Sequence, residues 1–89
     1  MTWRIEFEQS ALREFEKLSH SERARILAFL KDRLAARADP RQLGQPLKGS
    51  TLGEFWRYRV GHYRIVARLR DDALVILIIR VGHRRDVYR

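Results

Sequence analysis

The feature that most constrains the fold is an apolar segment near the C-terminus, Leu74–Ile79. Such a segment is apolar on both faces, which is typical of a strand at the centre of a sheet. We therefore expect residues 74–81 to form a central strand. Residues 81–88 follow it and read Val-Gly-His-Arg-Arg-Asp-Val-Tyr, so the strand delivers a histidine, two arginines and a tyrosine to one place. These are groups that chemistry on a phosphate or a nucleotide would use.

Alternating apolar and polar residues predict three further strands. One covers residues 3–7, and two others cover residues 55–60 and 63–69. Gly61-His62 should turn the chain between the latter two, and Asp71-Asp72 should turn it before the central strand.

Two helices are expected between the first strand and the others. Ser10 could cap a helix over roughly 11–18. Ser19 and Glu22 then form an S-x-x-E capping box, which predicts a second helix running to about residue 37. Proline disfavours helical geometry in the residue before it, so Asp39-Pro40 should end this region.

Residues 41–53 are rich in glycine and proline and are expected to be a loop. The chain as a whole, residues 1–89, then reads as one domain of the α+β class with the order β-α-α-β-β-β. Its two N-terminal helices should pack on one face of a mostly antiparallel sheet. With that face covered, the sheet should present arginines on the other: Arg57, Arg59, Arg64 and Arg68.

Composition limits the possible functions. The formal net charge is +8, which favours a polyanion or an acidic protein as partner. Residues 54–89 carry nine arginines, no lysine and four acidic residues. Arginine binds phosphate through two parallel hydrogen bonds, although genome composition would explain the preference for arginine equally well.

The sequence also limits membrane, metal and compartment assignments. The longest apolar run is too short to cross a bilayer. Without cysteines, and with three scattered histidines, we expect no metal site and no cofactor. The absence of cysteines and of a visible export signal favours the cytoplasm.

Three sequence motifs carry a resemblance to a known family. They are Pro46-Leu47-Lys48-Gly49, Phe55-Trp56-Arg57-Tyr58-Arg59-Val60-Gly61-His62-Tyr63-Arg64 and Val81-Gly82-His83-Arg84-Arg85-Asp86-Val87-Tyr88. With the predicted order of elements, they resemble the RelE branch of the RelE/ParE toxin superfamily over essentially the whole chain. The resemblance implies a toxin of a type II toxin–antitoxin system. It implies a metal-independent endoribonuclease that cuts mRNA in the ribosomal A site, where the ribose 2′-hydroxyl attacks the adjacent phosphate.

The resemblance also implies roles for individual residues. Arg64 and Arg84 match arginines that stabilise the phosphate, and Tyr88 matches a tyrosine that acts on the 2′-hydroxyl or stacks on the base. His83 is a further catalytic candidate, because an imidazole titrates near neutral pH and can transfer protons. Four basic residues are candidates for RNA binding: Lys48, Arg57, Arg59 and Arg85.

Arg57 and Arg59 stand roughly where well-studied members of the family carry lysines. Arginine stabilises developing negative charge but cannot exchange a proton near pH 7. The identity of the general base and acid therefore stays open, between His83 and a Tyr88 whose pKa neighbouring arginines would have to lower.

Two other functions remain open. A ParE-like toxin has the same fold but poisons DNA gyrase without this constellation of residues, and a plain RNA-binding domain would bind without cutting. Either toxin implies a cognate antitoxin, RelB-like for the RelE branch, that covers the basic face and orders on binding. A heterotetramer of toxin and antitoxin is one expected assembly, and the ribosome with its A-site mRNA is the expected target.

Overall fold

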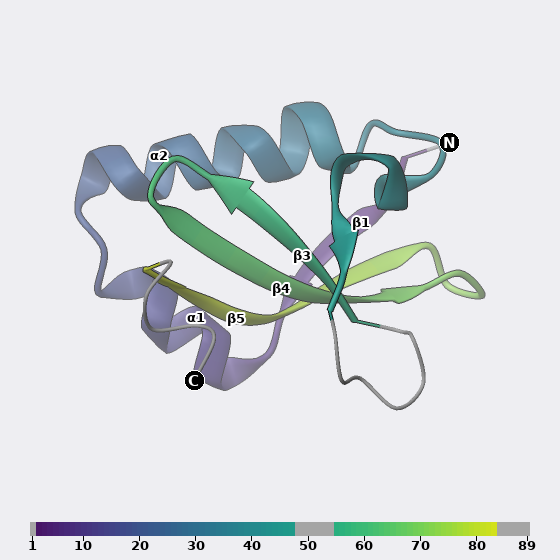
Figure 1. Ribbon diagram of the computed structural model, residues 1–89. Coiled ribbons are helices and arrows are strands. Elements are labelled where there is room, and N and C mark those ends of the chain that lie inside the picture. The colour runs from purple at the N-terminus through teal and green to yellow at the C-terminus, as the bar shows by residue number, and fades with distance from the viewer. Residues whose placement is uncertain (1, 48–54, 84–89) are drawn as a thin grey trace.

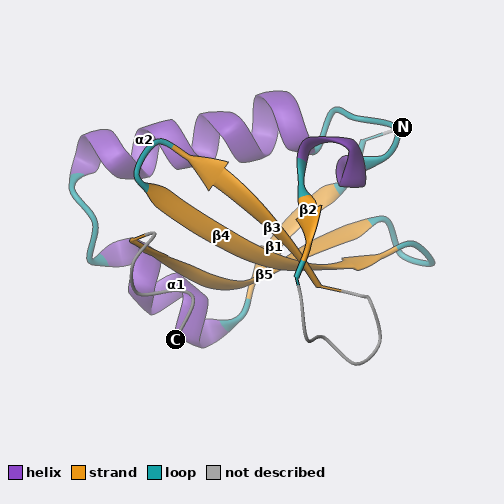
Figure 2. Ribbon diagram, viewed as in Figure 1, coloured by secondary structure: helices purple, strands orange, loops and turns teal. Residues whose placement is uncertain are grey.

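The chain folds into a layer of helices over one face of a five-stranded sheet, as the ribbons of the computed structural model show (Figures 1 and 2). The structure describes residues 2–47 and 55–83. Its strands are β1 (Arg4–Phe7), β2 (Gln45–Pro46), β3 (Phe55–Val60), β4 (Tyr63–Arg70) and β5 (Val75–His83), and its α-helices are α1 (Gln9–Glu16) and α2 (His20–Ala28). The expected fold class and order of elements are confirmed.

The strand order in the sheet is β1-β5-β4-β3-β2. Three neighbouring pairs are antiparallel, and β1 runs parallel to β5. Strand β5 therefore lies inside the sheet, as its apolar composition predicts. It joins the N-terminal strand β1 to the β3–β4 hairpin.

The core lies between the helices and this sheet. Ala11 and Phe15 from α1 and Ile26 from α2 are buried against residues of the three long strands: Tyr58, Val60, Ile65, Ala67, Leu69, Ile76, Ile78 and Val81. On β3 and β4 these core residues alternate with arginines, so the sheet turns its basic side chains away from the helices.

The second helix departs from regular geometry at its end. The capping box predicted from Ser19 and Glu22 is present. After α2, the residues Phe29–Leu34 form a π-helical turn in which the Ala35 N–H donates to the Leu30 carbonyl at 2.8 Å. The helical segment thus ends a few residues before the predicted boundary at 37.

Two local expectations were wrong. Ser10 does not cap the first helix, because α1 begins at Gln9 with Glu8 in the N-cap position and no side-chain cap bond. The expected loop over 41–53 holds regular structure in its described part, a 3₁₀ helix at Pro40–Leu43 followed by β2. Asp39 caps that 3₁₀ helix by accepting the Arg41 N–H at 3.1 Å.

Candidate functional site: an arginine-lined hollow

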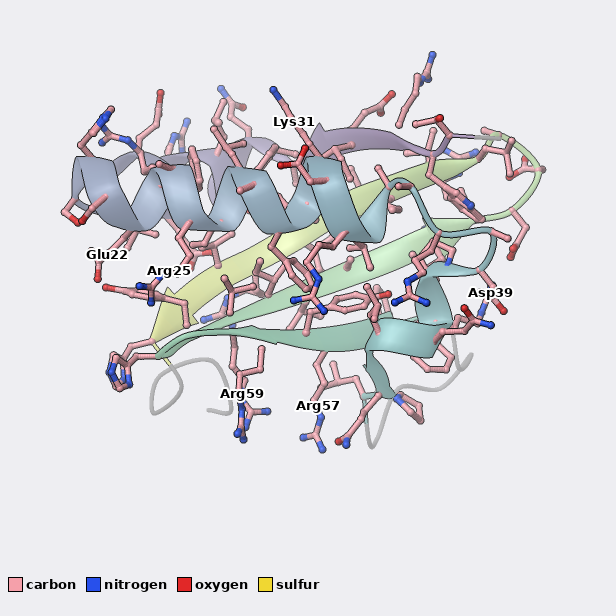
Figure 3. All side chains as sticks on the ribbon, turned by 90° about the horizontal axis from the view of Figure 1, so that it is seen from above. Glu22, Arg25, Lys31, Asp39, Arg57 and Arg59 are labelled. Atoms are coloured by element: carbon pink, nitrogen blue, oxygen red, sulfur yellow. The ribbon has the colours of Figure 1, made fainter. Side chains whose placement is uncertain are left out.

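A hollow of about 250 Å³ lies on the open face of the sheet, beside β3. Its lining combines the end of the 3₁₀ helix and the start of β2 with the arginines of β3 and β4. The lining residues are Leu43, Gly44, Gln45, Arg57, Tyr58, Arg59 and Arg64. Figure 3 shows Arg57 and Arg59 pointing away from α2, into the space in front of the sheet. Three of the predicted functional arginines are thus brought together.

Arg59 and Arg64 are directly opposite each other in the β3–β4 register. Like charges in this position repel and destabilise a sheet, so the pair favours an anion that bridges the two guanidinium groups. Arg64 is only 9% exposed, while Arg59 is exposed. Arg64 therefore lies beside Arg59 on the expected face of the sheet but is shielded from most of the solvent.

The position of Arg64 explains much of this burial. It lies on the central strand β4, with Arg59 on one side and Gly82 of β5 on the other. Neighbouring strands therefore flank Arg64 on both sides, which shields it from solvent. Gly82 also lies two residues before Arg84, at the point where the described part of β5 ends.

The wall of the hollow depends on a close approach between Gly44 and β3. A Cβ atom on Gly44 would lie 2.6 Å from Tyr58 Cε1 and 2.8 Å from the Arg57 carbonyl oxygen. Only glycine lets the chain pass this near. The Arg57 guanidinium donates to the Gln45 side-chain oxygen at 2.6 Å, which holds it at the rim.

Tyr58 also lines the hollow, although its ring packs in the core against Phe29. Its hydroxyl donates to the Pro40 carbonyl at 3.1 Å. Burial raises its pKa far above the ordinary value, because the phenolate would be desolvated. Tyr58 therefore supplies shape and not a general base.

His83 lies elsewhere. At the end of β5 its ring stacks on His62 with centroids 6.3 Å apart, and Tyr63 packs edge-on against it at 5.9 Å. Tyr63 also hydrogen-bonds Glu22 on α2, which raises the pKa of the tyrosine and lowers the pKa of the carboxyl. The structure thus places His83 beside the His62 turn and Tyr63, and not among the residues that line the hollow.

Four predicted site residues lie outside the described residues: Lys48, Arg84, Arg85 and Tyr88. Sequence reasoning missed a residue of α1 that contacts the end of β5, shortly before these C-terminal residues. Glu14 on α1 accepts the Val81 N–H at 2.9 Å and lies 3.4 Å from Arg80 Nε. Glu14 and Val81 are far apart in the sequence, so no local signal could have identified the pair.

Within the described residues, no group of three or more histidine, cysteine or acidic side chains could hold a metal ion. Nor does that part of the chain contain a helix long and apolar enough to cross a membrane. The chemistry that the hollow offers is anion binding by fixed positive charge.

A helix pair over a mostly antiparallel sheet with a cationic open face is the architecture of small toxins from toxin–antitoxin systems. A family model described as the ParE toxin of the type II toxin–antitoxin system parDE matches residues 5–88. The chain belongs to this RelE/ParE superfamily of type II toxins.

Individual relatives agree with this assignment. Toxin RelG of Mycobacterium tuberculosis (strain ATCC 25618 / H37Rv) is 33% identical over 89 residues, covering 100% of this chain and 99% of the relative. The toxin–antitoxin complex RelBE2 from the same species contains a chain that superposes with a TM-score of 0.82 at 29% identity, covering 97% and 95% of the two chains. The archaeal RelE–RelB complex from Pyrococcus horikoshii OT3 gives a TM-score of 0.74 at 24% identity, covering 97% of this chain and 99% of that one, and shows the shared fold alone.

Proposed function

We propose that this toxin is a ribosome-dependent endoribonuclease that cuts mRNA in the A site and so inhibits translation. The observation that carries the proposal is that Arg57, Arg59 and Arg64 line one hollow on the open face of the sheet. Attack of a ribose 2′-hydroxyl on the adjacent phosphate expels the 5′-oxygen of the next nucleotide, which takes up a proton, and leaves a 2′,3′-cyclic phosphate. Negative charge builds on the phosphoryl oxygens during this step. Fixed guanidinium groups stabilise that charge without a metal ion.

The remaining roles belong to the C-terminal residues. Arg84 is proposed to act on the phosphate with Arg64, and Tyr88 on the 2′-hydroxyl or the base. Because arginine does not exchange protons near neutral pH, proton transfer is left to His83 or Tyr88. Lys48 and Arg85 are proposed to bind RNA outside the reacting phosphate. An enzyme acting on ribosomes works in the cytoplasm.

The proposed inhibitor is a RelB-like antitoxin. The similar M. tuberculosis chain was solved in a toxin–antitoxin complex, which supports this partner. The net charge of +8 suits an acidic segment that covers the basic face. A heterotetramer is the assembly we propose for the complex.

The test is a reconstituted translation reaction on a defined mRNA, with 5′ ends mapped by primer extension with and without ribosomes. We expect new ends inside the coding region only with ribosomes. Arg64→Ala and Arg84→Ala should each remove them. The matched control is Arg70→Ala, on the same strand as Arg64 but outside the hollow, which should cut normally.

A second candidate is favoured by the family model itself, which is described as a ParE toxin. A ParE-like toxin would poison DNA gyrase and leave mRNA intact. If folded protein arrests growth without cutting mRNA, and inhibits gyrase in a supercoiling assay, this second function replaces the first.

A further inference from the structure

A second hollow, of about 420 Å³, lies between the second helical segment and the end of the β3–β4 hairpin. Arg59 lines both hollows, the first on the open face of the sheet and the second on the side of β3 that faces the helix. The other lining residues of the second hollow are Arg25, Ala28, Phe29, Asp32, Arg33, Val60 and Gly61. Its volume falls within the range of about 300–1,000 Å³ that small-ligand sites occupy.

The two hollows differ in chemistry. The first is lined mainly by arginines and polar groups, whereas the second has an apolar base made by Ala28, Phe29 and Val60. The Phe29 ring is half-buried and packs against Tyr58, with centroids 6.1 Å apart. The Arg33 guanidinium lies over the Phe29 ring at 5.8 Å, so the two groups make one stacked platform.

Three charged residues, Arg25, Asp32 and Arg33, line the second hollow around its apolar base. Arg25 lies against the hairpin turn, where a Cβ on Gly61 would come within 2.8 Å of Arg25 Nη1. Figure 3 shows Arg25 directed from α2 toward the sheet, while Lys31 points away from it. Asp32 and Arg33 come from the π-helical turn, a distortion that often marks functional positions.

We propose that the second hollow is a base-binding subsite. The same single strand of RNA whose phosphate occupies the arginine-lined hollow passes around β3 at Arg59 and places a neighbouring base on the Phe29–Arg33 platform. This inference rests on the proposed function and extends it to sequence preference. Alternation of a cationic hollow and an apolar aromatic one matches the alternation of phosphate and base in single-stranded RNA.

Asp32 would give the subsite its specificity. A carboxylate accepts hydrogen bonds from the amino groups of cytosine, adenine and guanine, and uracil has no amino group to offer. The apolar base of the hollow argues against an acidic peptide as the occupant, because Ala28, Phe29 and Val60 offer a surface to a flat base and nothing to a carboxylate.

The test is binding of short RNA that cannot be cleaved, because its riboses carry 2′-O-methyl groups. Affinity is measured for a cytosine-containing tetranucleotide and for the same RNA with the cytosine base removed. In the wild-type protein, loss of the base should weaken binding about tenfold. Amide signals of Ala28, Val60 and Gly61 should shift in nuclear magnetic resonance spectra with the intact RNA only.

Variants then show which residues are responsible for the dependence of binding on the base. Arg33→Ala should bring the ratio between intact and abasic RNA close to one. Asp32→Asn should reduce the preference for cytosine over uracil. Lys31→Ala is the control, since Lys31 is exposed on the same turn and points away from the sheet, and it should keep both ratios.

Several results would overturn the subsite. They are a wild-type ratio near one, no RNA binding at all, or amide shifts at these residues with a glutamate-rich peptide but not with RNA. The last result would make the hollow a peptide groove. If the toxin cleaves mRNA in the translation reaction but binds intact and abasic RNA equally well, the subsite is refuted and the proposed function stands. If binding depends on the base but no mRNA is cleaved, the subsite stands and the proposed function is refuted.

Discussion

The carboxylate of Glu14 on α1 accepts the backbone N–H of Val81 on β5. Strand β1 ends at Phe7, and the last bond between the two segments runs from the Glu8 N–H to the Ile78 carbonyl. Beyond that bond the edge of β5 needs another partner, and a helix side chain supplies it. The first helix therefore supplies the hydrogen-bond partner that β1 no longer provides and fixes the position of β5 at Val81.

Glu14→Ala should lower the free energy of unfolding by about 1–3 kcal/mol, because it leaves the partly buried Val81 N–H without an acceptor. Glu14→Gln keeps an acceptor oxygen and should cost less. Denaturant unfolding measures both. Glu16→Ala, at an exposed position of the same helix, is the control, and an equal loss there would contradict the assigned role.

The opposed pair Arg59 and Arg64 predicts that anions stabilise the fold. Inorganic phosphate should raise Tm of the wild-type protein more than chloride at equal ionic strength does. Arg59→Gln should weaken this response and, by relieving like-charge repulsion, raise the basal stability by about 0.2–1 kcal/mol. Arg70→Gln should leave the phosphate response intact. If it also removed the response, the anion would bind elsewhere.

The close approach at Gly44 predicts a steric penalty. Gly44→Ala would push a methyl group into Tyr58 and the Arg57 carbonyl, and should destabilise the protein by about 1–3 kcal/mol. The same displacement should reduce phosphate binding in the hollow. Gln42→Ala, an exposed change in the preceding 3₁₀ helix, should do neither.

Asp71 gives a pH dependence with a defined sign. Arg41 donates to its carboxylate at 3.1 and 2.6 Å, which lowers the pKa of Asp71 in the folded state. A lowered folded pKa means that the pair contributes stability above the unfolded pKa, near 4, and loses it as the pH falls through the folded value. The pair is largely exposed, so its contribution should stay below about 1 kcal/mol.

The measurement is unfolding of wild type and Asp71→Asn between about pH 2 and pH 7. Their stabilities should differ at neutral pH and converge in acid. The control is Asp72→Asn, whose carboxylate lies 3.9 Å from Arg70, and it should track the wild type. A difference that grew in acid would refute the assignment.

The sequence patterns correctly predicted the features that depend on interactions between residues close together in the chain. The bounds of β3 and the Ser19–Glu22 capping box follow from period-two alternation and from side-chain bonds within one turn. A strand of two residues such as Gln45–Pro46 has no period, so nothing in the sequence could distinguish it from a loop. Alternation also placed Arg64 on the open face but could not show its burial, which depends on how neighbouring strands align.

The same limit applies to the candidate site. The arginines of β3 and β4 were predicted to share a face, because a hairpin sets their register. The place of His83 beside His62 and Tyr63 depends on how the end of β5 meets the hairpin turn. The Phe29–Arg33 platform depends on a π-helical turn, which shifts side chains away from regular helical spacing.

The sheet order has a consequence for how the fold forms. Strand β5 joins β1 to the β3–β4 hairpin, with Arg4 opposite Val75. Until β5 is in place, β1 and the hairpin cannot belong to one sheet, and Arg64 lacks its neighbour Gly82. Because the pairing of β1 with β5 closes a long loop of chain, we expect the docking of β5 to limit the rate of folding.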